Sequence, residues 1–346
     1  MAKQDYNIVG DQIGDLGGEM PTTMGKLKHK ESYGGKTELN KDEESEMDAF
    51  LKRSRSHKEG DESAQISDGW IPIDRKDMGR RSEYYPQSWT FYIRPATVQA
   101  IKNWTAVDEE RMDAVNNVFN EIIKTCVKIV TTDGTSVSWN QVKSWDRFWF
   151  ILKVREYTYS SSAKKTVDFE DECSECEQEM TFVLNSNNLF YEFPDDELEE
   201  KFWNGTEWII DPSEYNVDHE TITLYPPTLG KDEAIINWAT EKYRQDNKKP
   251  DETFIKFLIW LLPKPVKDTQ LFDRQIQKIY KEYKGWSIDM FTFMNDVVNN
   301  ITINPSEKLK SRCPHCGQEA TSTVQFPNGV KVLFEAQTNV KKFGSR

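Results

Sequence analysis

The order of hydrophobic and polar residues predicts both strands and helices in this chain. Alternation with a period of two is typical of half-buried strands. Short runs of this kind occupy residues 89–94, 166–169, 180–184 and 221–225. Spacing of three or four is typical of one helix face, and apolar residues recur in this way at Met112, Val115, Phe119, Ile122, Cys126 and Ile129. The spacing predicts a long helix that ends before a turn at residues 132–135.

A second helix is predicted over residues 140–155, and its apolar face is rich in aromatic residues. That face would carry Val142, Trp145, Trp149 and Leu152. Because large aromatic residues at helical spacing are most often buried, we expect Trp145 and Trp149 to lie in the core. Any exposed surplus of aromatic surface would indicate a protein interface.

Residues 185–304 are predicted to form a mainly helical insert. Its acidic run at 195–200 is interpreted as the exposed start of a helix, since acidic groups are favoured there by the helix dipole. Further helical patterning, interrupted by Pro or Gly, occupies residues 232–244, 252–262, 268–283 and 287–299. The most apolar run, 254–262, is too short to cross a membrane, so no membrane span is predicted.

Residues 1–68 differ from the rest of the chain because they are polar, mixed in charge and poor in aromatic residues. Such a composition does not support a fold of its own. We therefore predict an extended N-terminal arm that is ordered on neighbouring subunits, with a short local helical turn at 47–51 as the alternative. The basic run at 52–55 is flanked by acids, which favours an acidic protein partner or solubility over nucleic acid.

The overall charge also argues against nucleic acid as a partner. Lys and Arg number 45 and Asp and Glu number 58, which gives a net charge of −13. This sign disfavours binding to phosphate backbones. The first residues carry no apolar core of a secretory signal, so we expect a reducing cytosol in which disulfides are disfavoured.

Four of the five cysteines form two Cys-x-x-Cys pairs, Cys173 with Cys176 and Cys313 with Cys316. Two such turns can place four thiolates about 2.3 Å from one tetrahedral zinc ion. Disulfides and a redox motif are the alternatives, but the second would require a neighbouring βαβ pattern that neither pair has. A closed four-thiolate site leaves no position for water, so the predicted Zn²⁺ is structural. His315 is interpreted as a loop residue and Cys126 as a core residue.

The residues around the cysteines predict a zinc ribbon. Strand-like runs flank the first pair, and residues 320–326 and 330–334 after the second pair predict a hairpin with a turn at 327–329. Gly317 suits the positive φ that such a turn often needs. The predicted fold class is α+β, with mixed helices and short strands, a four-cysteine zinc ribbon from two distant knuckles, a helical insert between them and an extended N-terminal arm. The predicted domains are residues 1–68 (arm), 69–184 (α+β part with the first knuckle), 185–304 (insert) and 305–346 (second knuckle and C-terminal hairpin).

No catalytic constellation is recognisable in the sequence. The phosphate-binding Gly-x-x-x-x-Gly-Lys loop, the Gly-x-Gly-x-x-Gly loop, the Gly-x-Ser-x-Gly elbow and the His-Glu-x-x-His zinc helix are all missing. Only four histidines are available as bases. The sequence therefore predicts no catalytic residues and a protein that is not an enzyme.

The order of several motifs is distinctive. A strand that ends in residues 93–97 precedes a helix with residues 122–127, and then the run 146–157 begins with Asp146 and Arg147. The first cysteine pair follows soon after and the second comes late in the chain. Over roughly residues 84–334, this order resembles the baseplate hub proteins of T-even-type contractile-tailed bacteriophages.

The resemblance implies a structural component of the virion tail, made in the host cytoplasm, without enzymatic activity and packed among other baseplate proteins. It would be an oligomer or present in several copies, and would bind its neighbours through the arm and aromatic surface. A function of another class is the alternative: zinc ribbons recur in transcription and replication, so this chain could be an adaptor that binds such machinery.

Overall fold

The computed structural model describes residues 69–108, 111–159, 166–247, 251–306, 308–324 and 333–334. The predicted arm, with its basic run and its short helical turn, lies outside the described residues. No helix in the described part of the chain is long and apolar enough to cross a membrane.

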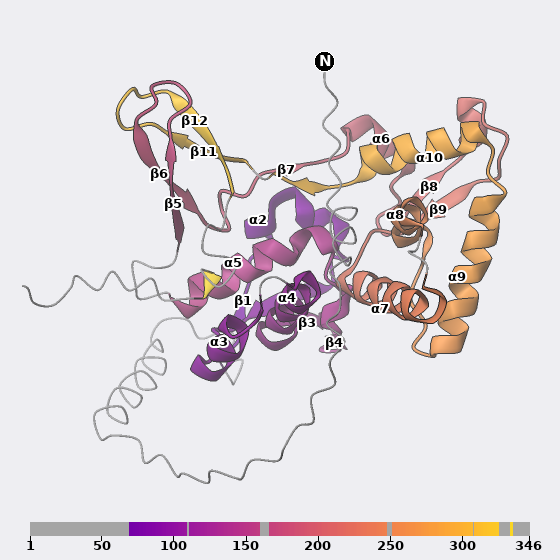
Figure 1. The fold of residues 1–346 in the computed structure, drawn as a ribbon, viewed down its shortest axis with the longest axis horizontal. Coiled ribbons are helices and arrows are strands. Elements are labelled where there is room, and N and C mark those ends of the chain that lie inside the picture. The colour runs from indigo at the N-terminus through magenta and orange to yellow at the C-terminus, as the bar shows by residue number, and fades with distance from the viewer. Residues whose placement is uncertain are drawn as a thin grey trace, which may run out of the picture. The chain divides into compact units, whose positions relative to one another are not determined.

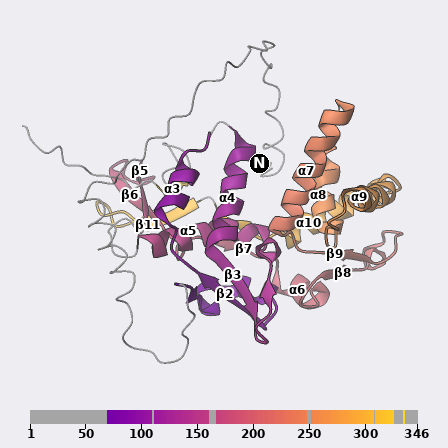
Figure 2. The ribbon, with the colours of Figure 1, turned by 90° about the horizontal axis from the view of Figure 1, so that it is seen from below.

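The N-terminal part is built on a four-stranded antiparallel sheet. Its strands follow the order β1 (Ile71–Pro72), β2 (Trp89–Ile93), β3 (Val127–Thr131) and β4 (Ser136–Val137). The register pairs Phe91 with Ile129, and both side chains are buried. The connection from β1 to β2 contains α2 (Arg75–Met78) and the 3-10 turn η1 (Gly79–Tyr84), and the connection from β2 to β3 contains α3 (Val98–Thr105) and α4 (Met112–Cys126). Figure 2 shows these elements from a second side.

The first predicted helix is confirmed in its N-terminal part and wrong at its end. Helix α4 ends at Cys126, and Ile129 lies on β3 rather than on the helix. At Val127 the sequence changes to β-branched residues on either side of Lys128, which favours a strand. Pairing of this run with β2 therefore ends the helix three residues before the last apolar position of the helical spacing.

The second predicted helix begins later than its pattern suggested. Helix α5 spans Arg147–Thr158, and two 3-10 turns, η2 (Trp139–Gln141) and η3 (Ser144–Asp146), precede it. Val142 between them has an extended backbone, and its carbonyl accepts the Leu229 N–H at 2.9 Å. This contact with the insert outweighs the local pattern. Helix α5 is also buried on all sides from Trp149 to Arg155, so the single apolar face predicted for it is wrong.

Two antiparallel hairpins carry the cysteine pairs and lie side by side (Figure 1). The first joins β5 (Val167–Glu172) to β6 (Glu179–Leu184), as predicted. The second joins β11 (Lys308–Arg312) to β12 (Glu319–Thr323). Strand β12 thus pairs with the residues before the second cysteine pair, and the hairpin predicted from residues 320–326 and 330–334 falls largely outside the described residues and stays a prediction. Leu333 and Phe334 lie in a turn with buried side chains, and residues 325–332 are outside the described residues.

The helices predicted in the insert are confirmed. They are α7 (Leu229–Asp246), α8 (Glu252–Leu261), α9 (Thr269–Lys284) and α10 (Ile288–Ile301), and they follow the acidic helix α6 (Asp196–Phe202). Each of the four begins after a side-chain N-cap, namely Thr228, Asp251, Asp268 and Ser287. The hairpin β8 (Trp208–Ile210) and β9 (Ile222–Leu224) encloses the 3-10 turn η4 (Pro212–Tyr215), and β7 (Tyr191–Glu192) pairs with β10 (Asn304–Pro305) where the chain enters and leaves the insert.

The buried residues that the structure describes form two clusters, one around α5, the sheet and the cysteine hairpins, and one made mostly of insert residues. Trp149 belongs to the first and Trp145 to the second, which confirms that both are core residues. Asp146 accepts hydrogen bonds from Arg81 at 2.5 Å and from the Tyr85 hydroxyl at 2.8 Å. The next residue, Arg147, forms an ion pair at 2.9 Å with Asp232 and so connects the start of α5 with α7 of the insert.

Candidate metal centre

The four paired cysteines converge at the tips of the two hairpins. Their sulfur atoms all lie within 4.8 Å of one another. The Cys173 sulfur is 3.8 Å from that of Cys316, and the Cys176 sulfur is 3.7 Å from that of Cys313. Ligands about 2.3 Å from a tetrahedral zinc ion would be separated by about 3.8 Å. The arrangement therefore has the size that a four-thiolate zinc site requires.

The two cysteine turns have the same backbone hydrogen bonds. In the first, the Cys173 N–H donates to the Gln178 carbonyl at 2.9 Å and the Cys173 carbonyl accepts the Glu177 N–H at 2.9 Å. In the second, the Cys313 N–H donates to the Gln318 carbonyl at 2.8 Å and the Cys313 carbonyl accepts the Gly317 N–H at 2.9 Å. These bonds close each turn and direct its two sulfurs toward the other hairpin.

A repeated sequence pattern underlies this structural match. The pattern Cys-x-x-Cys-x-Gln-Glu-x-Thr occurs at residues 173–181 and again at 313–321. Gln178 and Gln318 supply the carbonyls that close the turns, and Glu179 and Glu319 each begin the second strand of a hairpin. The cysteines, Gly317 and the following strand-like runs were predicted from the sequence, whereas the shared Gln178 and Gln318 were not. Comparing the two cysteine regions position by position is the signal that would have revealed the closing residues.

The turns differ at the residue that follows the second cysteine. Gly317 has φ of 75°, which confirms the expected positive φ. Glu177 occupies the same position in the first turn with φ of 58°, although it has a side chain. Left-handed backbone of this kind disfavours residues with a Cβ atom. The first turn is therefore held in a conformation that its own sequence does not favour.

Hydrogen bonds from the backbone act unequally on the sulfurs. The N–H groups of Cys316 and His315 favour the thiolate of Cys313 and lower its pKa to about 6. At Cys176 the backbone N–H of Gln178 favours the thiolate, but desolvation and the three neighbouring sulfurs outweigh it and raise the pKa to about 12. Four sulfurs this close cannot all carry a negative charge without a cation between them. A divalent metal ion would remove this conflict.

The other candidate residues from the sequence are not members of this cluster of four cysteines. Cys126 is fully buried among apolar residues, as expected, and burial raises the pKa of its thiol to about 11. His315 is exposed in the second turn, and its backbone N–H points toward the Cys313 sulfur at 3.4 Å. The acidic run forms the exposed start of α6, except that Glu199 accepts hydrogen bonds from Arg80 at 2.6 Å and from Tyr84 at 2.8 Å.

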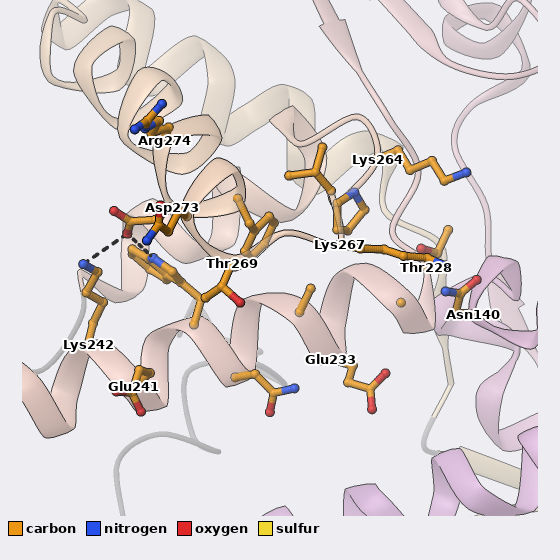
Figure 3. A pocket seen from close by; sticks show the side chains of 18 of the residues that line it. Asn140, Thr228, Glu233, Glu241, Lys242, Lys264, Lys267, Thr269, Asp273 and Arg274 are labelled. Atoms are coloured by element: carbon orange, nitrogen blue, oxygen red, sulfur yellow. Dashed lines mark hydrogen bonds and ion pairs between the residues drawn. The ribbon is translucent and has the colours of Figure 1, made fainter.

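A groove of about 710 Å³ lies along α7 and the start of α9 (Figure 3). Asp273 on its wall accepts hydrogen bonds from the Trp238 indole at 2.9 Å and from Lys242 at 3.1 Å. These two donors lower the pKa of Asp273, with Trp238 as the larger cause, and keep it ionised. The lining contains neither histidine nor cysteine.

Comparison with known proteins supports the interpretation of the motif order. Residues 81–335, well over half of the chain, match the family model described as T4 bacteriophage base plate protein. No curated protein and no solved structure matches the chain. The matched region contains both hairpins, all four paired cysteines and the Asp146–Arg147 link. The comparison gives no support to an adaptor of transcription or replication machinery. The chain belongs to the T4 bacteriophage base plate protein family.

Proposed function

We propose that this chain is a structural, non-enzymatic component of a bacteriophage tail baseplate, at or near its hub, and that a Zn²⁺ ion held by Cys173, Cys176, Cys313 and Cys316 stabilises it. The family match supports a place in the tail. The convergence of the four sulfurs within 4.8 Å carries the metal part of the proposal.

Zinc would act by joining parts of the chain that are far apart in sequence. Cys173 and Cys316 are separated by 143 positions, and the whole insert lies between the hairpins. Because unfolded thiols offer no preformed site, the free energy of metal binding contributes directly to folding. The role of the ion would be to fix the two hairpins against each other, since four thiolates leave no open position for chemistry.

Neighbouring tail proteins would be bound by the N-terminal arm and by exposed aromatic residues. In the described part of the chain, Phe190, Tyr215 and Phe291 are among the exposed aromatic side chains, at 48%, 45% and 36% exposure. Most of the tryptophans described here are buried or half-buried. The aromatic surface is therefore made of separate Phe and Tyr positions, and several of them lie on the insert. We propose that the protein is present in several copies, without nucleic acid as a partner.

Metal analysis tests the zinc role. We expect the purified, reduced chain to contain one equivalent of zinc per molecule, as four thiolates complete one tetrahedral site. The variant Cys313→Ser should lose it, whereas Ser174→Ala, an exposed change in the first turn, should keep it. Zinc that stays bound to the Cys313→Ser variant at full occupancy would contradict the proposed ligand set.

Analysis of purified particles tests the place in the tail. We expect mass spectrometry to find this chain in virions or in isolated baseplates made in the host cytoplasm. Residues 1–68 should be cleaved by protease in the isolated chain and protected in the particle. An arm that is cleaved equally in both would rule out its binding to neighbours, and absence from particles and from assembly intermediates would rule out the structural role.

A further inference from the structure

We propose that oxidation converts the four-thiol centre into two disulfides that cross between the hairpins, Cys173–Cys316 and Cys176–Cys313, so that the hairpins stay joined after the metal leaves. This inference rests on the proposed zinc role for its reduced state. The disulfides are a second state of the same four residues. They form a modification site that the metal role by itself does not imply.

Distances between the hairpins favour these pairs. The sulfurs of Cys173 and Cys316 lie 3.8 Å apart and those of Cys176 and Cys313 lie 3.7 Å apart. A disulfide bond is about 2.0 Å long, so each pair must approach by somewhat less than 2 Å. Both pairs shorten when the two hairpin tips move toward each other. The backbone hydrogen bonds that close each turn can remain in place during this movement.

Each proposed pair contains one accessible and one buried sulfur. Cys316 is exposed and its partner Cys173 is buried, while Cys176 is half-buried and its partner Cys313 is buried. The accessible sulfur can meet an oxidant from solvent. The buried sulfur, already within 4 Å on the opposite hairpin, can then complete the disulfide.

The chemistry requires an oxidant, and a small-molecule disulfide such as oxidised glutathione is sufficient. The thiolate of Cys316 attacks one sulfur of oxidised glutathione, forms a mixed disulfide and releases one glutathione thiolate. The thiolate of Cys173 then attacks the Cys316 sulfur, which forms the Cys173–Cys316 bond and releases the second glutathione thiolate. Two cysteine thiolates are oxidised by two electrons and one glutathione disulfide is reduced. A Zn²⁺ ion held by the four thiolates would lose two of its ligands and be released to solvent. The same sequence of attacks, with a second molecule of oxidised glutathione, joins Cys176 to Cys313.

Surface charge predicts that the two disulfides form in this order. Oxidised glutathione is an anion, and the first turn presents exposed Glu175 and Glu177. The second turn has no acidic residue between Cys313 and Gln318 and is flanked by Arg312, whose side chain donates to the Gly317 carbonyl at 2.9 Å. Repulsion at the first turn and attraction at the second favour attack by Cys316 over attack by Cys176.

The second state suits a particle that leaves the cell. In a reducing cytoplasm the thiols are available to zinc, whereas outside the cell oxidants are present. Disulfides within each turn would join neighbouring residues and leave the hairpins separate. Disulfides across the hairpins would instead preserve the connection that zinc provides.

A peptide map of the oxidised full chain tests the pairing. The zinc-loaded protein is treated with oxidised glutathione in the presence of a coloured zinc chelator and is then digested with trypsin without reduction. Cys173 and Cys176 fall in the peptide 166–201, and Cys313 and Cys316 fall in the peptide 313–331. We expect release of one equivalent of zinc, loss of both separate peptides and their replacement by one linked pair. Fragmentation should connect Cys173 to Cys316 and Cys176 to Cys313, with the first link formed earlier.

Two further measurements accompany the map. The oxidised, metal-free protein should unfold at a higher temperature than the reduced, metal-free protein. The variant Cys173→Ser/Cys316→Ser should form the single remaining link between Cys176 and Cys313 on oxidation, while buried Cys126 stays reduced. If this variant does not fold, the map of the unmodified chain still decides the question.

The outcomes separate this inference from the zinc role. Separate peptides that each contain an internal disulfide, or links that pair the residues differently, would overturn the inference and leave the zinc role intact. A reduced protein that contains no zinc but forms the two expected links would overturn the zinc role and leave the disulfides standing.

Discussion

The two hairpins that carry the cysteines share one turn geometry but differ in what lies beneath it. The first hairpin buries Val167, Met180, Phe182 and Leu184. The second buries Leu309 and the small residues Ala320 and Ser322. Because hydrophobic stabilisation grows with the apolar area that is buried, the first hairpin has much the larger share. The same sulfur centre should therefore matter more to the second hairpin than to the first.

Contacts with α5 strengthen this contrast. Arg155 on α5 donates to the Thr166 carbonyl at 3.0 Å, directly before β5. Phe182 and Leu184 belong to the same buried cluster as most of α5. The second hairpin contributes Leu309 and Ala320 to this cluster and packs along β6 through β11. It is also joined to the first hairpin by the hydrogen bond from the Ser322 hydroxyl to Asp171, at 2.5 Å, and by the cysteines. Both hairpins thus belong to the main core, but the first contributes more large apolar side chains to it than the second.

Loss of a cysteine ligand from the second turn should cause the largest difference in stability between the two hairpins. We expect Cys313→Ser to release the metal and to lower the unfolding temperature by roughly 10 °C or more, because the energy of metal binding is part of the folding energy. Hydrogen exchange should increase most in β11 and β12 and much less in β5 and β6. Calorimetry together with metal analysis checks the first point, and Ser174→Ala is the control. Equal loss of protection in both hairpins would show that they depend on the metal to the same extent.

Truncation of one buried side chain in each hairpin, Phe182 or Leu309, should give the next largest difference in unfolding free energy. Phe182→Ala removes a fully buried ring from the first hairpin and should cost about 4 kcal/mol whether or not metal is bound. Leu309→Ala removes the main apolar side chain of the second hairpin and should cost about 2 to 3 kcal/mol. Denaturant unfolding of both variants, with zinc and with chelator, measures the two costs. A larger cost for Leu309→Ala would reverse the proposed ranking of the hairpins.

The hydrogen bond between the hairpins should make a smaller contribution. Ser322→Ala leaves the exposed Asp171 free to bind water, so the free energy of unfolding should fall by only about 1 kcal/mol. A double-mutant cycle with Asp171→Ala isolates the coupling between the two side chains, which should be about 1 kcal/mol as well. Additive effects of the two changes would mean that this contact does not connect the hairpins energetically.

The sequence predicted the features whose cause is local. The insert helices begin at residues whose side chains accept a backbone N–H, and this capping signal is present in the sequence. The spacing within each cysteine pair likewise identified four residues that the fold brings together. In both cases a few neighbouring residues determine the outcome.

Features that depend on distant contacts were not predictable in this way. The extended backbone at Val142 is stabilised by Leu229, which lies far along the chain. Ile129 fits helical spacing, but pairing with Phe91 assigns it to a strand. In each case a contact made only in the folded chain outweighed a local preference.

Substitution of the residue after the second cysteine of each turn should have the smallest effect on stability, and it tests the turn backbone alone. Glu177 and Gly317 have the same left-handed backbone, with φ of 58° and 75°, and no atom would come within 4 Å of a Cβ atom added at Gly317. Only the backbone preference then separates the two positions, so Glu177→Gly should stabilise the first turn by about 0.5 to 1 kcal/mol and Gly317→Ala should destabilise the second by about 1 kcal/mol. Denaturant unfolding of the zinc-loaded variants measures whether each change raises or lowers the free energy of unfolding. Glu175→Ala, an exposed change in the first turn, is the control. Two changes of the same sign would show that side-chain charge, rather than backbone conformation, determines stability here. Opposite signs would show that the turns are equivalent, and would attribute the difference between the hairpins to the residues buried beneath them.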